Sequence, residues 1–395
     1  MNRRTPLLSA AIAASLLSTA AANAAEFRTA EQPLEGRYIV VLKDDAASRA
    51  SNGLIRPLPA SDMAVRMAAS HRFEVERSYD NALRGFAVKA DDAALARLLA
   101  DPRVAYVEED GIVTIDATQN NATWGLDRVD QRNLPLNTRY VYNRTASNVH
   151  VYVIDTGVRT THSQFTGRIG NGATAISDGR GVQDCNGHGT HVAGTIGGST
   201  WGVAKGVKIH PVRVLGCTGS GSTSGVIAGM DWVATNRVRP AVANMSLGGG
   251  KSTAMNDAVQ RMINRGVTVV VAAGNSNADA CGFSPASAPA AITVGSTDNN
   301  DRRSSFSNFG SCLDVFAPGR NITSAWYTSN TASNTISGTS MAAPHVAGAA
   351  ALYLSNHTGA SPGAVRNAIF NNATTGKVTS RGSGSPNRLL YTRNF

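Results

Sequence analysis

Runs of valine, isoleucine and alanine that alternate with helical stretches constrain this fold more than any other feature. The predicted strands are Val149–Asp155, Lys208–Leu215, Ala241–Leu247 and Val267–Ala273. One predicted helix begins at His188, and the others are Ser224–Asn236, Thr253–Arg265, Ser340–Leu354 and Ser361–Phe370. Apolar strands that alternate with helices form a parallel sheet covered on both faces. We therefore expect an α/β fold whose functional groups gather at the carboxyl ends of the strands.

Residues 1–24 have the pattern of a secretory signal peptide. Arg3 and Arg4 precede an apolar run from Leu7 to Leu17, and Ala22-Asn23-Ala24 forms a cleavage site of small residues. The run is too short for a permanent membrane span, and a buried N-terminal helix is the less favoured alternative. We expect a secreted, extracellular protein that does not bind membranes.

Residues 25–118 are predicted to form a separate α+β unit that ends between Asp116 and Gln119. The order is strand, helix, strand, strand, helix, strand, which is typical of a ferredoxin-like fold. The predicted elements are Arg37–Leu42, Asp62–Ala69, Phe73–Tyr79, Gly85–Lys89, Asp91–Ala100 and Arg103–Glu108.

The two parts of the chain differ in charge. Residues 26–118 contain 12 Lys and Arg against 16 Asp and Glu, a net charge of −4, and residues 119–395 contain 23 against 11, a net charge of +12. Opposite charges favour association of the two parts. The basic residues are scattered, without a cluster that includes aromatic residues, so we expect a solvated basic surface and no nucleic-acid partner.

Ser340 lies where a polar loop turns into an Ala-rich helix, within Ser337–Gly348. Free backbone N–H groups at a helix start favour negative charge, which suits a nucleophile whose substrate oxygen becomes an anion. The alternative is a simple N-cap serine. Pro344 is expected in the first turn, where its missing N–H costs nothing.

Two further stretches favour catalysis. Val149–Gly157 is an apolar strand that ends in Asp155, and His188–Ile196 is a helix start with a histidine at its first position. Asp, His and Ser at the ends of such elements are the parts of a nucleophilic triad. Ser340 would be the nucleophile, His188 the proton acceptor and donor, and Asp155 the group that orients the imidazole.

Together these stretches, in this order, resemble the subtilisin family of serine proteases (the subtilase family), specifically its proteinase K-like branch. The resemblance implies a three-layer α/β peptidase domain at residues 119–395. Residues 25–118 would then be a self-cleaved propeptide that acts as intramolecular inhibitor and chaperone. It also implies that Asn275, in Ala-Ala-Gly-Asn, donates a side-chain N–H to the oxyanion; read alone, Asn275 is a turn residue.

Two glycine-containing segments resemble the family's substrate-binding strands, which pair with an extended peptide through main-chain hydrogen bonds. They are Gly219-Ser220-Gly221 and Ser246-Leu247-Gly248-Gly249. Neither segment contains an acidic residue. We therefore expect a roomy pocket for the substrate residue that precedes the cut bond, with a preference for apolar or aromatic side chains there. The simpler interpretation is a pair of glycine turns.

Four cysteines in an exported chain indicate two disulfides with three possible pairings. The resemblance implies the pairs Cys185–Cys217 and Cys281–Cys312, each worth roughly 3–4 kcal/mol in the chain-entropy model. It also implies structural calcium. One set of ligands would be the carbonyls of Pro289 and Ala291 with the carboxylate of Asp314. The other set would be Asp127, Asp130 and Gln131. Near this second set the chain has Arg139 at a position where relatives have a further oxygen ligand.

The expected protein is a monomeric, calcium-stabilised, self-processing serine endopeptidase that acts on proteins and peptides through an acyl-enzyme. A silent secreted binding protein with the same scaffold is the main alternative. An esterase is disfavoured because no Gly-x-Ser-x-Gly elbow surrounds Ser340. His191, one turn after His188, is expected to be structural and not a metal ligand.

Overall fold

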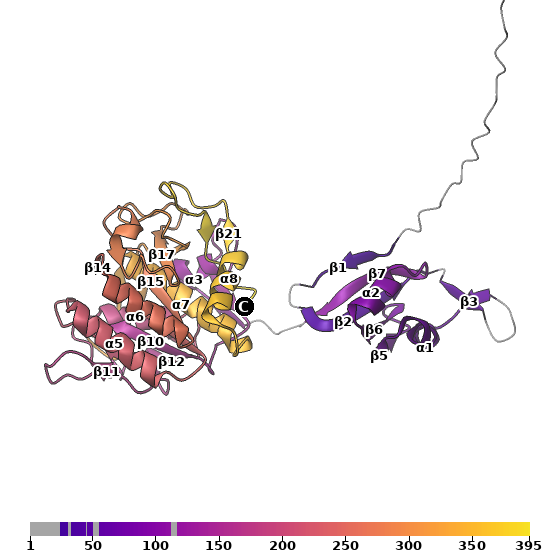
Figure 1. The fold of residues 1–395 in the computed structure, drawn as a ribbon, viewed down its shortest axis with the longest axis horizontal. Coiled ribbons are helices and arrows are strands. Elements are labelled where there is room, and N and C mark those ends of the chain that lie inside the picture. The colour runs from indigo at the N-terminus through magenta and orange to yellow at the C-terminus, as the bar shows by residue number, and fades with distance from the viewer. Residues whose placement is uncertain (1–23, 31–32, 45, 50–54, 112–116) are drawn as a thin grey trace, which may run out of the picture. The chain divides into compact units, whose positions relative to one another are not determined.

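The computed structural model describes residues 24–395 apart from 31–32, 45, 50–54 and 112–116. The expected signal peptide, except for Ala24, therefore lies outside the described residues, and so does Asp116. The chain divides into two compact units, residues 1–113 and 114–395 (Figure 1). This division lies close to the expected end of the propeptide, and the precise domain boundaries remain a prediction.

The first unit has the β-α-β-β-α-β order expected of a ferredoxin-like fold, preceded by an edge strand, with a separate two-stranded sheet (β3 and β4) inserted between β2 and α1. Its sheet has the order β1-β7-β2-β6-β5, and apolar residues of α1 and α2 share one core with β2, β6 and β7. Helix α2 begins at the predicted place because the Asp91 carboxylate accepts a hydrogen bond from the Ala94 N–H at 2.7 Å. The elements are β1 (Glu26–Arg28), β2 (Pro33–Leu42), β3 (Ala47–Arg49), β4 (Ile55–Pro57), α1 (Ala60–His71), β5 (Glu74–Tyr79), β6 (Gly85–Lys89), α2 (Asp92–Leu99) and β7 (Val104–Gly111).

The second unit is built on the expected parallel sheet, in which β21 is the antiparallel strand among those described. The sheet order is β11 (Ala173–Thr174), β12 (Lys208–Arg213), β10 (His150–Asp155), β13 (Ala241–Met245), β15 (Val267–Ala272), β17 (Ile292–Thr297), β18 (Val315–Pro318), β22 (Arg388–Leu389) and β21 (Thr374–Thr375). Because β10, β13 and β15 are parallel neighbours, their carboxyl ends meet at one edge. Asp155, Ser246 and Asn275 lie at or just past these three ends.

Helices cover both faces of this sheet, so the fold has the three expected layers (Figure 1). Side chains alternate along β10: Val151 and Val153 pack toward α4, α7 and α8, whereas Tyr152 and Ile154 pack toward α5 and α6. The helices are α3 (Trp124–Val129), α4 (His188–Gly197), α5 (Thr223–Asn236), α6 (Thr253–Asn264), α7 (Thr339–Asn356) and α8 (Pro362–Asn372). The smaller elements are β8 (Ala117–Asn120), β9 (Arg139–Tyr142), η1 (Ser163–Phe165), β14 (Gly249–Gly250), η2 (Ala280–Gly282), β16 (Phe283–Ser284), β19 (Ile322–Ala325) and β20 (Ser333–Ile336). None of the described helices has the length and hydropathy needed to cross a membrane.

Several elements differ from the sequence-based expectation, and two of these differences have a clear physical reason. Strands β17 and β18 were not predicted, because they are short and contain Gly, Ser, Thr or Pro within the apolar run. Pro344 lies in the second turn of α7, since the helix begins at Thr339. Its missing N–H therefore leaves the Ser340 carbonyl without its usual helical partner.

Candidate active site

Asp155 and His188 are brought together by the end of β10 and the start of α4. The imidazole Nδ1 lies 2.7 Å from Asp155 Oδ1, which also accepts the Thr156 N–H at 2.7 Å. The Asp155 side chain is fully buried, whereas 25% of the His188 side chain is exposed. A buried carboxylate thus fixes one ring nitrogen as the proton-bearing one and leaves Nε2 as a proton acceptor.

The two histidines of α4 differ in basicity. Burial disfavours the charged form of His188, but the Asp155 carboxylate, together with Asp184, outweighs this effect and raises the pKa of His188. His191 is buried, its Nε2 lies 2.9 Å from the Ile322 carbonyl, and burial lowers its pKa to about 3. His188 therefore suits proton transfer, and His191 connects α4 to β19.

Ser340 is the second residue of α7 and forms a reciprocal pair with Ser246. The Ser340 hydroxyl donates to the Ser246 carbonyl at 3.1 Å, and the Ser246 hydroxyl donates to the Ser340 carbonyl at 2.8 Å. The second bond satisfies the carbonyl that Pro344 leaves without a helical donor. Among the hydrogen bonds of the described residues, none joins Ser340 to His188. Rotation about one side-chain bond redirects such a hydroxyl, and catalytic hydrogen bonds often tighten only when substrate binds.

Asn275 is oriented by a residue that sequence reasoning missed. Its Oδ1 accepts hydrogen bonds from the backbone N–H and the hydroxyl of Thr339, at 2.8 and 2.9 Å. The Thr339 hydroxyl in turn accepts the Gly274 N–H at 3.1 Å. Because Oδ1 is occupied, the amide must present its Nδ2–H groups on the other side. The position of Thr339 directly before Ser340 was the available signal.

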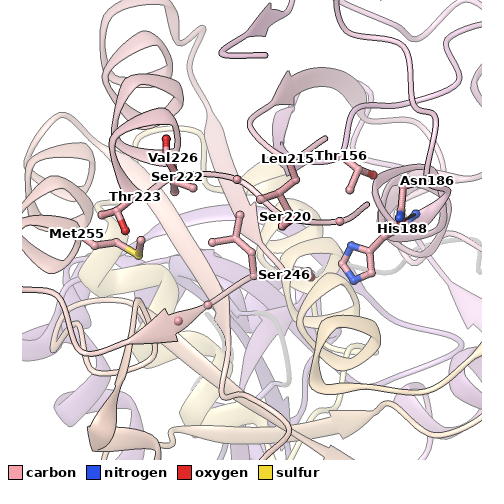
Figure 2. A pocket seen from close by; sticks show the side chains of 15 residues that line it. Thr156, Asn186, His188, Leu215, Ser220, Ser222, Thr223, Val226, Ser246 and Met255 are labelled. Atoms are coloured by element: carbon pink, nitrogen blue, oxygen red, sulfur yellow. Dashed lines mark hydrogen bonds between the residues drawn. The ribbon is translucent and has the colours of Figure 1, made fainter. Parts of the chain in front are cut away.

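Two clefts meet beside these residues. Figure 2 shows the first, of about 380 Å³, with His188 on one side, Met255 and Thr223 on the other, and Ser246 between them. The second has about 270 Å³ and contains Asn275 and Ser340 in its wall. The expected substrate segments line the first cleft, and the two clefts share Leu247, Gly248 and Gly249. None of the residues that line either cleft is an Asp, Glu, Lys or Arg.

The Asp314 carboxylate, expected as a calcium ligand, already has partners for both oxygens. The Thr293 N–H donates to Oδ2 at 2.9 Å, and the Arg366 guanidinium donates to Oδ1 at 2.7 Å. Burial raises the pKa of Asp314 despite these partners. Pro289 is exposed and Ala291 is buried next to β17. The oxygen atoms of Pro289, Ala291 and Asp314 suit a hard cation such as Ca²⁺. However, the Arg366 guanidinium already compensates the negative charge of Asp314.

The stretch from Asp127, in α3, to Gln131, just past the end of that helix, fits a cation better. Asp127 accepts the N–H groups of Asn137 and Thr138 at 3.2 and 2.6 Å, and Asp130 Oδ2 accepts that of Val141 at 2.7 Å. Asp130 Oδ1 is buried without a hydrogen-bond partner. Burial, followed by the nearby Asp127 carboxylate, raises the pKa of Asp130 to about 6. A buried, unpartnered carboxylate oxygen beside a second carboxylate is the environment that Ca²⁺ stabilises.

Gln131 and Arg139 complete the description of this candidate cation site. The Gln131 side chain donates from Nε2 to the carbonyls of Asn133 and Pro135, so its Oε1 stays available as a ligand. The Arg139 side chain is exposed. An exposed arginine does not occupy the buried position at Asp130, so this residue does not exclude a cation there.

Both disulfides have the pairing that the resemblance implied. Cys185 is joined to Cys217, and Cys281 to Cys312. The Cys185–Cys217 disulfide connects the loop before His188 to the segment just before Gly219-Ser220-Gly221, which lines the first cleft. The Asn186 side chain adds a hydrogen bond of 3.0 Å to the Cys217 carbonyl. The histidine and the substrate segment are thus tied together covalently.

Comparison with known proteins identifies both units. The Subtilase family matches residues 146–389, and the Peptidase inhibitor I9 family matches residues 37–116. The chain is 59% identical over 372 residues to an extracellular serine proteinase of Thermus sp. (strain Rt41A), covering 92% of this chain and 91% of that protein. It is 44% identical to proteinase R of Parengyodontium album, covering 90% and 88%.

A solved structure agrees with this assignment. The crystal structure of a cold adapted subtilisin-like serine proteinase has a TM-score of 0.67 and 57% identity, and covers 69% of this chain and 99% of that one. The expected enzyme class, precursor organisation and extracellular location are confirmed by these relatives. The chain belongs to the subtilase family of serine proteases and has a peptidase inhibitor I9 domain before its catalytic domain.

Proposed function

We propose that Asp155, His188 and Ser340 are the catalytic residues with which the protein hydrolyses peptide bonds in proteins and peptides. This proposal rests on the hydrogen bond between His188 Nδ1 and Asp155 Oδ1, whose two atoms lie 2.7 Å apart at the sheet edge beside Ser340. This bond holds the proton on Nδ1, so that Nε2 is free to accept the proton of the serine hydroxyl. An inert scaffold gains little from a buried carboxylate in this position.

The reaction follows in two halves. Ser340 Oγ attacks the carbonyl carbon of the substrate while His188 Nε2 takes its proton, and a tetrahedral oxyanion forms. His188 then gives this proton to the departing amine, which leaves an acyl-enzyme on Ser340. Water, activated by His188 in the same way, releases the acid product. Asp155 stays ionised and stabilises the imidazolium in both halves.

We assign the stabilisation of the oxyanion to Asn275 and to the Ser340 backbone N–H. The hydrogen bonds from Thr339 hold the amide before substrate arrives, so no free energy is needed to reorient it during the reaction. The start of α7 adds its partial positive charge at the same place. These interactions strengthen as negative charge develops on the oxygen, and they therefore increase kcat more than affinity.

The clefts favour extended peptides with an apolar or aromatic residue before the cut bond. In the second cleft, Phe283, Ala272 and Ala286 surround a space that carries no charged side chain. In the first cleft, Met255, Val226 and other apolar groups face a further substrate residue. Main-chain groups of 219–221 and 246–249 would bind the peptide backbone whatever its side chains.

The propeptide, which begins at Ala25, would be removed by the enzyme itself after acting as inhibitor and chaperone. Strand β8 begins at Ala117, where it pairs with Tyr142 of β9, so residues from Ala117 onward belong to the catalytic unit. This pairing favours a cut at the start of the expected range, between Asp116 and Ala117. We propose a monomeric mature enzyme.

Structural calcium is the proposed cofactor. Asp127, Asp130 and Gln131 would bind one ion through oxygen atoms, and the unpartnered oxygen of Asp130 supports this assignment. Pro289, Ala291 and Asp314 would bind another ion less tightly, because Arg366 already lies 2.7 Å from Asp314. Bound calcium would supply positive charge that stabilises these loops, at a distance from the reacting atoms.

A casein assay of the purified protein tests the proposed function. We expect hydrolysis that a serine-directed covalent inhibitor abolishes, and we expect the Ser340→Ala chain to remain a folded, uncut precursor in a protease-free host. A Ser340→Ala chain that matures normally would remove Ser340 from the mechanism. A folded wild-type protein that leaves casein intact would favour the binding-protein alternative.

A further inference from the structure

The Asp184 carboxylate accepts five hydrogen bonds although it is not a member of the triad. Its Oδ1 accepts the Thr156 hydroxyl and the N–H groups of Asn186 and Gly187, each at 2.9 Å. Its Oδ2 accepts the N–H and the hydroxyl of Thr190, at 3.0 and 2.6 Å. All five donors lie beside β10 or around the first turn of α4. The carboxylate thus joins the end of β10, the loop before α4 and the first turn of α4 through hydrogen bonds.

These donors connect Asp184 to both partners of the acid–base pair. Thr156 follows Asp155, and its backbone N–H donates to the Asp155 carboxylate at 2.7 Å. The Thr156 hydroxyl accepts the Gly189 N–H at 2.9 Å while it donates to Asp184. Asp184 therefore links the residue after Asp155 to the residues on either side of His188. Loss of these bonds would release the loop that sets the direction of the imidazole.

The charge of Asp184 also acts on the imidazole. The charged groups that act on the ring are Asp155 and Asp184; His191 lies one turn along α4, and the Arg213–Asp178 ion pair lies at the end of the neighbouring strand β12. His191 is held neutral by burial, and Arg213 is neutralised by Asp178 at 2.6 Å. Two carboxylates therefore favour the imidazolium, and Asp184 is the one that does not bind the ring.

We propose that Asp184 is a positioning residue for His188, and that its negative charge helps to set the pH range in which His188 is a free base. The inference rests on the proposed function, because it assumes that His188 is the general base. It predicts two separable effects. Loss of the hydrogen bonds lowers kcat, and loss of the charge moves the acid limb of the pH profile.

The test compares Asp184→Asn with Asp231→Asn, an exposed aspartate of α5 that controls for net charge. The asparagine keeps one acceptor oxygen, so we expect kcat to fall about 3- to 10-fold at the plateau with KM nearly unchanged. Without the negative charge the imidazolium is less stable, and the acid limb of kcat/KM should move to lower pH by about half a unit. Activity at low pH, as a fraction of the plateau, then rises about threefold. Asp231→Asn should show neither effect.

A second variant separates position from charge. Thr190→Val removes one donor to Asp184 but keeps the carboxylate charged, so it should lower the plateau and leave the acid limb in place. Titration of the His188 ring by NMR, in Ser340→Ala chains with and without Asp184→Asn, measures the same shift without turnover or maturation. A ring pKa that is unchanged or raised by Asp184→Asn would overturn the charge effect. An unchanged plateau in both active variants would overturn the positioning role. Activity in the Ser340→Ala chain would instead contradict the proposed function.

Discussion

Two buried aspartates in the catalytic domain have similar local geometry but opposite electrostatic surroundings. Asp155 is 0% exposed and Asp130 is 5% exposed, and each has one buried oxygen without a hydrogen-bond partner. The other oxygen of Asp155 lies 2.7 Å from His188, whereas that of Asp130 accepts the Val141 N–H. Among the charged groups that act on Asp130, the Asp127 carboxylate has a larger effect than the Arg393 guanidinium, which only partly offsets it.

This difference shows that the function of a buried carboxylate depends on whether the protein itself provides a positively charged partner. Removing a carboxylate from water disfavours its charge, and a partner that can become positive restores it. At Asp155 the partner is His188, whose pKa is raised in return, so the pair is ready for proton transfer. At Asp130 the pKa rises to about 6, because burial and Asp127 act together. One site contains its cation, and the other is suited to a cation from solution.

Asp155→Asn tests the first half of this comparison and has the largest expected effect. The asparagine can donate to Nδ1, which would place the imidazole proton on Nε2 and prevent it from accepting the serine proton. We expect kcat to fall about 10⁴-fold, the size measured for the same aspartate-to-asparagine change in the triad of a chymotrypsin-type protease, with little change in KM. Steady-state kinetics on a peptide amide measure it, with matured protein obtained by adding a trace of active enzyme. A loss below tenfold would show that Asp155 only packs against the ring.

Asn275→Ala tests whether a neutral amide contributes as much to transition-state stabilisation as the Asp155–His188 pair does. Its Nδ2–H acts only on charge that develops in the transition state, so kcat should fall and KM should change little. The expected loss is about 10²–10³-fold, the size measured in a subtilisin. The control is Asn277→Ala, two residues later in the same loop. A raised KM with unchanged kcat would mean that Asn275 binds substrate and does not stabilise the oxyanion.

The sequence alone predicted that Asp155, His188 and Ser340 form one candidate site, and their catalytic roles stay a prediction. Asp155, His188 and Ser340 occur in distinctive stretches at element ends, and alternating apolar runs indicated the parallel sheet that brings them together. Both disulfide pairs followed from the resemblance. Such features are local in sequence, or they depend on residue types that few other roles require.

The supporting residues could not be predicted in this way. Thr339 and Asp184, and the pairing of Ser246 with Ser340, depend on hydrogen bonds whose partners lie up to 94 residues away, and these residue types are common in loops. Strands β17 and β18 become buried strands through the neighbours that cover them, which a single-sequence pattern does not reveal. The relative fit of the two calcium sets depended on Arg366, which is 52 residues from Asp314.

Calcium tests the second half of the comparison through thermal stability. If an ion stabilises the folded state at about 100 times its Kd, the gain is about 2.7 kcal/mol, which for a domain of this size is about 5 °C in Tm. Asp130→Asn keeps an acceptor for Val141 but removes the charge, so it should lose most of this increment. Scanning calorimetry of the inhibited enzyme, with excess calcium and with a chelator, measures it. An increment that is unchanged in Asp130→Asn would place the responsible ion elsewhere.

Arg366→Met sharpens the comparison at a third carboxylate, with the smallest expected effect. Asp314 has an internal cation, since Arg366 lies 2.7 Å from it and the side chains are 32% and 13% exposed. Methionine keeps an apolar chain against Phe370 but removes the charge, so in chelator Tm should fall by about 2–4 °C. Calcium should then restore the loss, and the increment should exceed that of the wild type, because the ion no longer competes with a guanidinium. Arg388→Met is the comparison variant: Arg388 covers the same ring at 4.8 Å and acts on Asp314 through its charge without a described hydrogen bond, so its effect on the calcium increment should be smaller. Equal increments in wild type and Arg366→Met would show that Asp314 does not bind calcium.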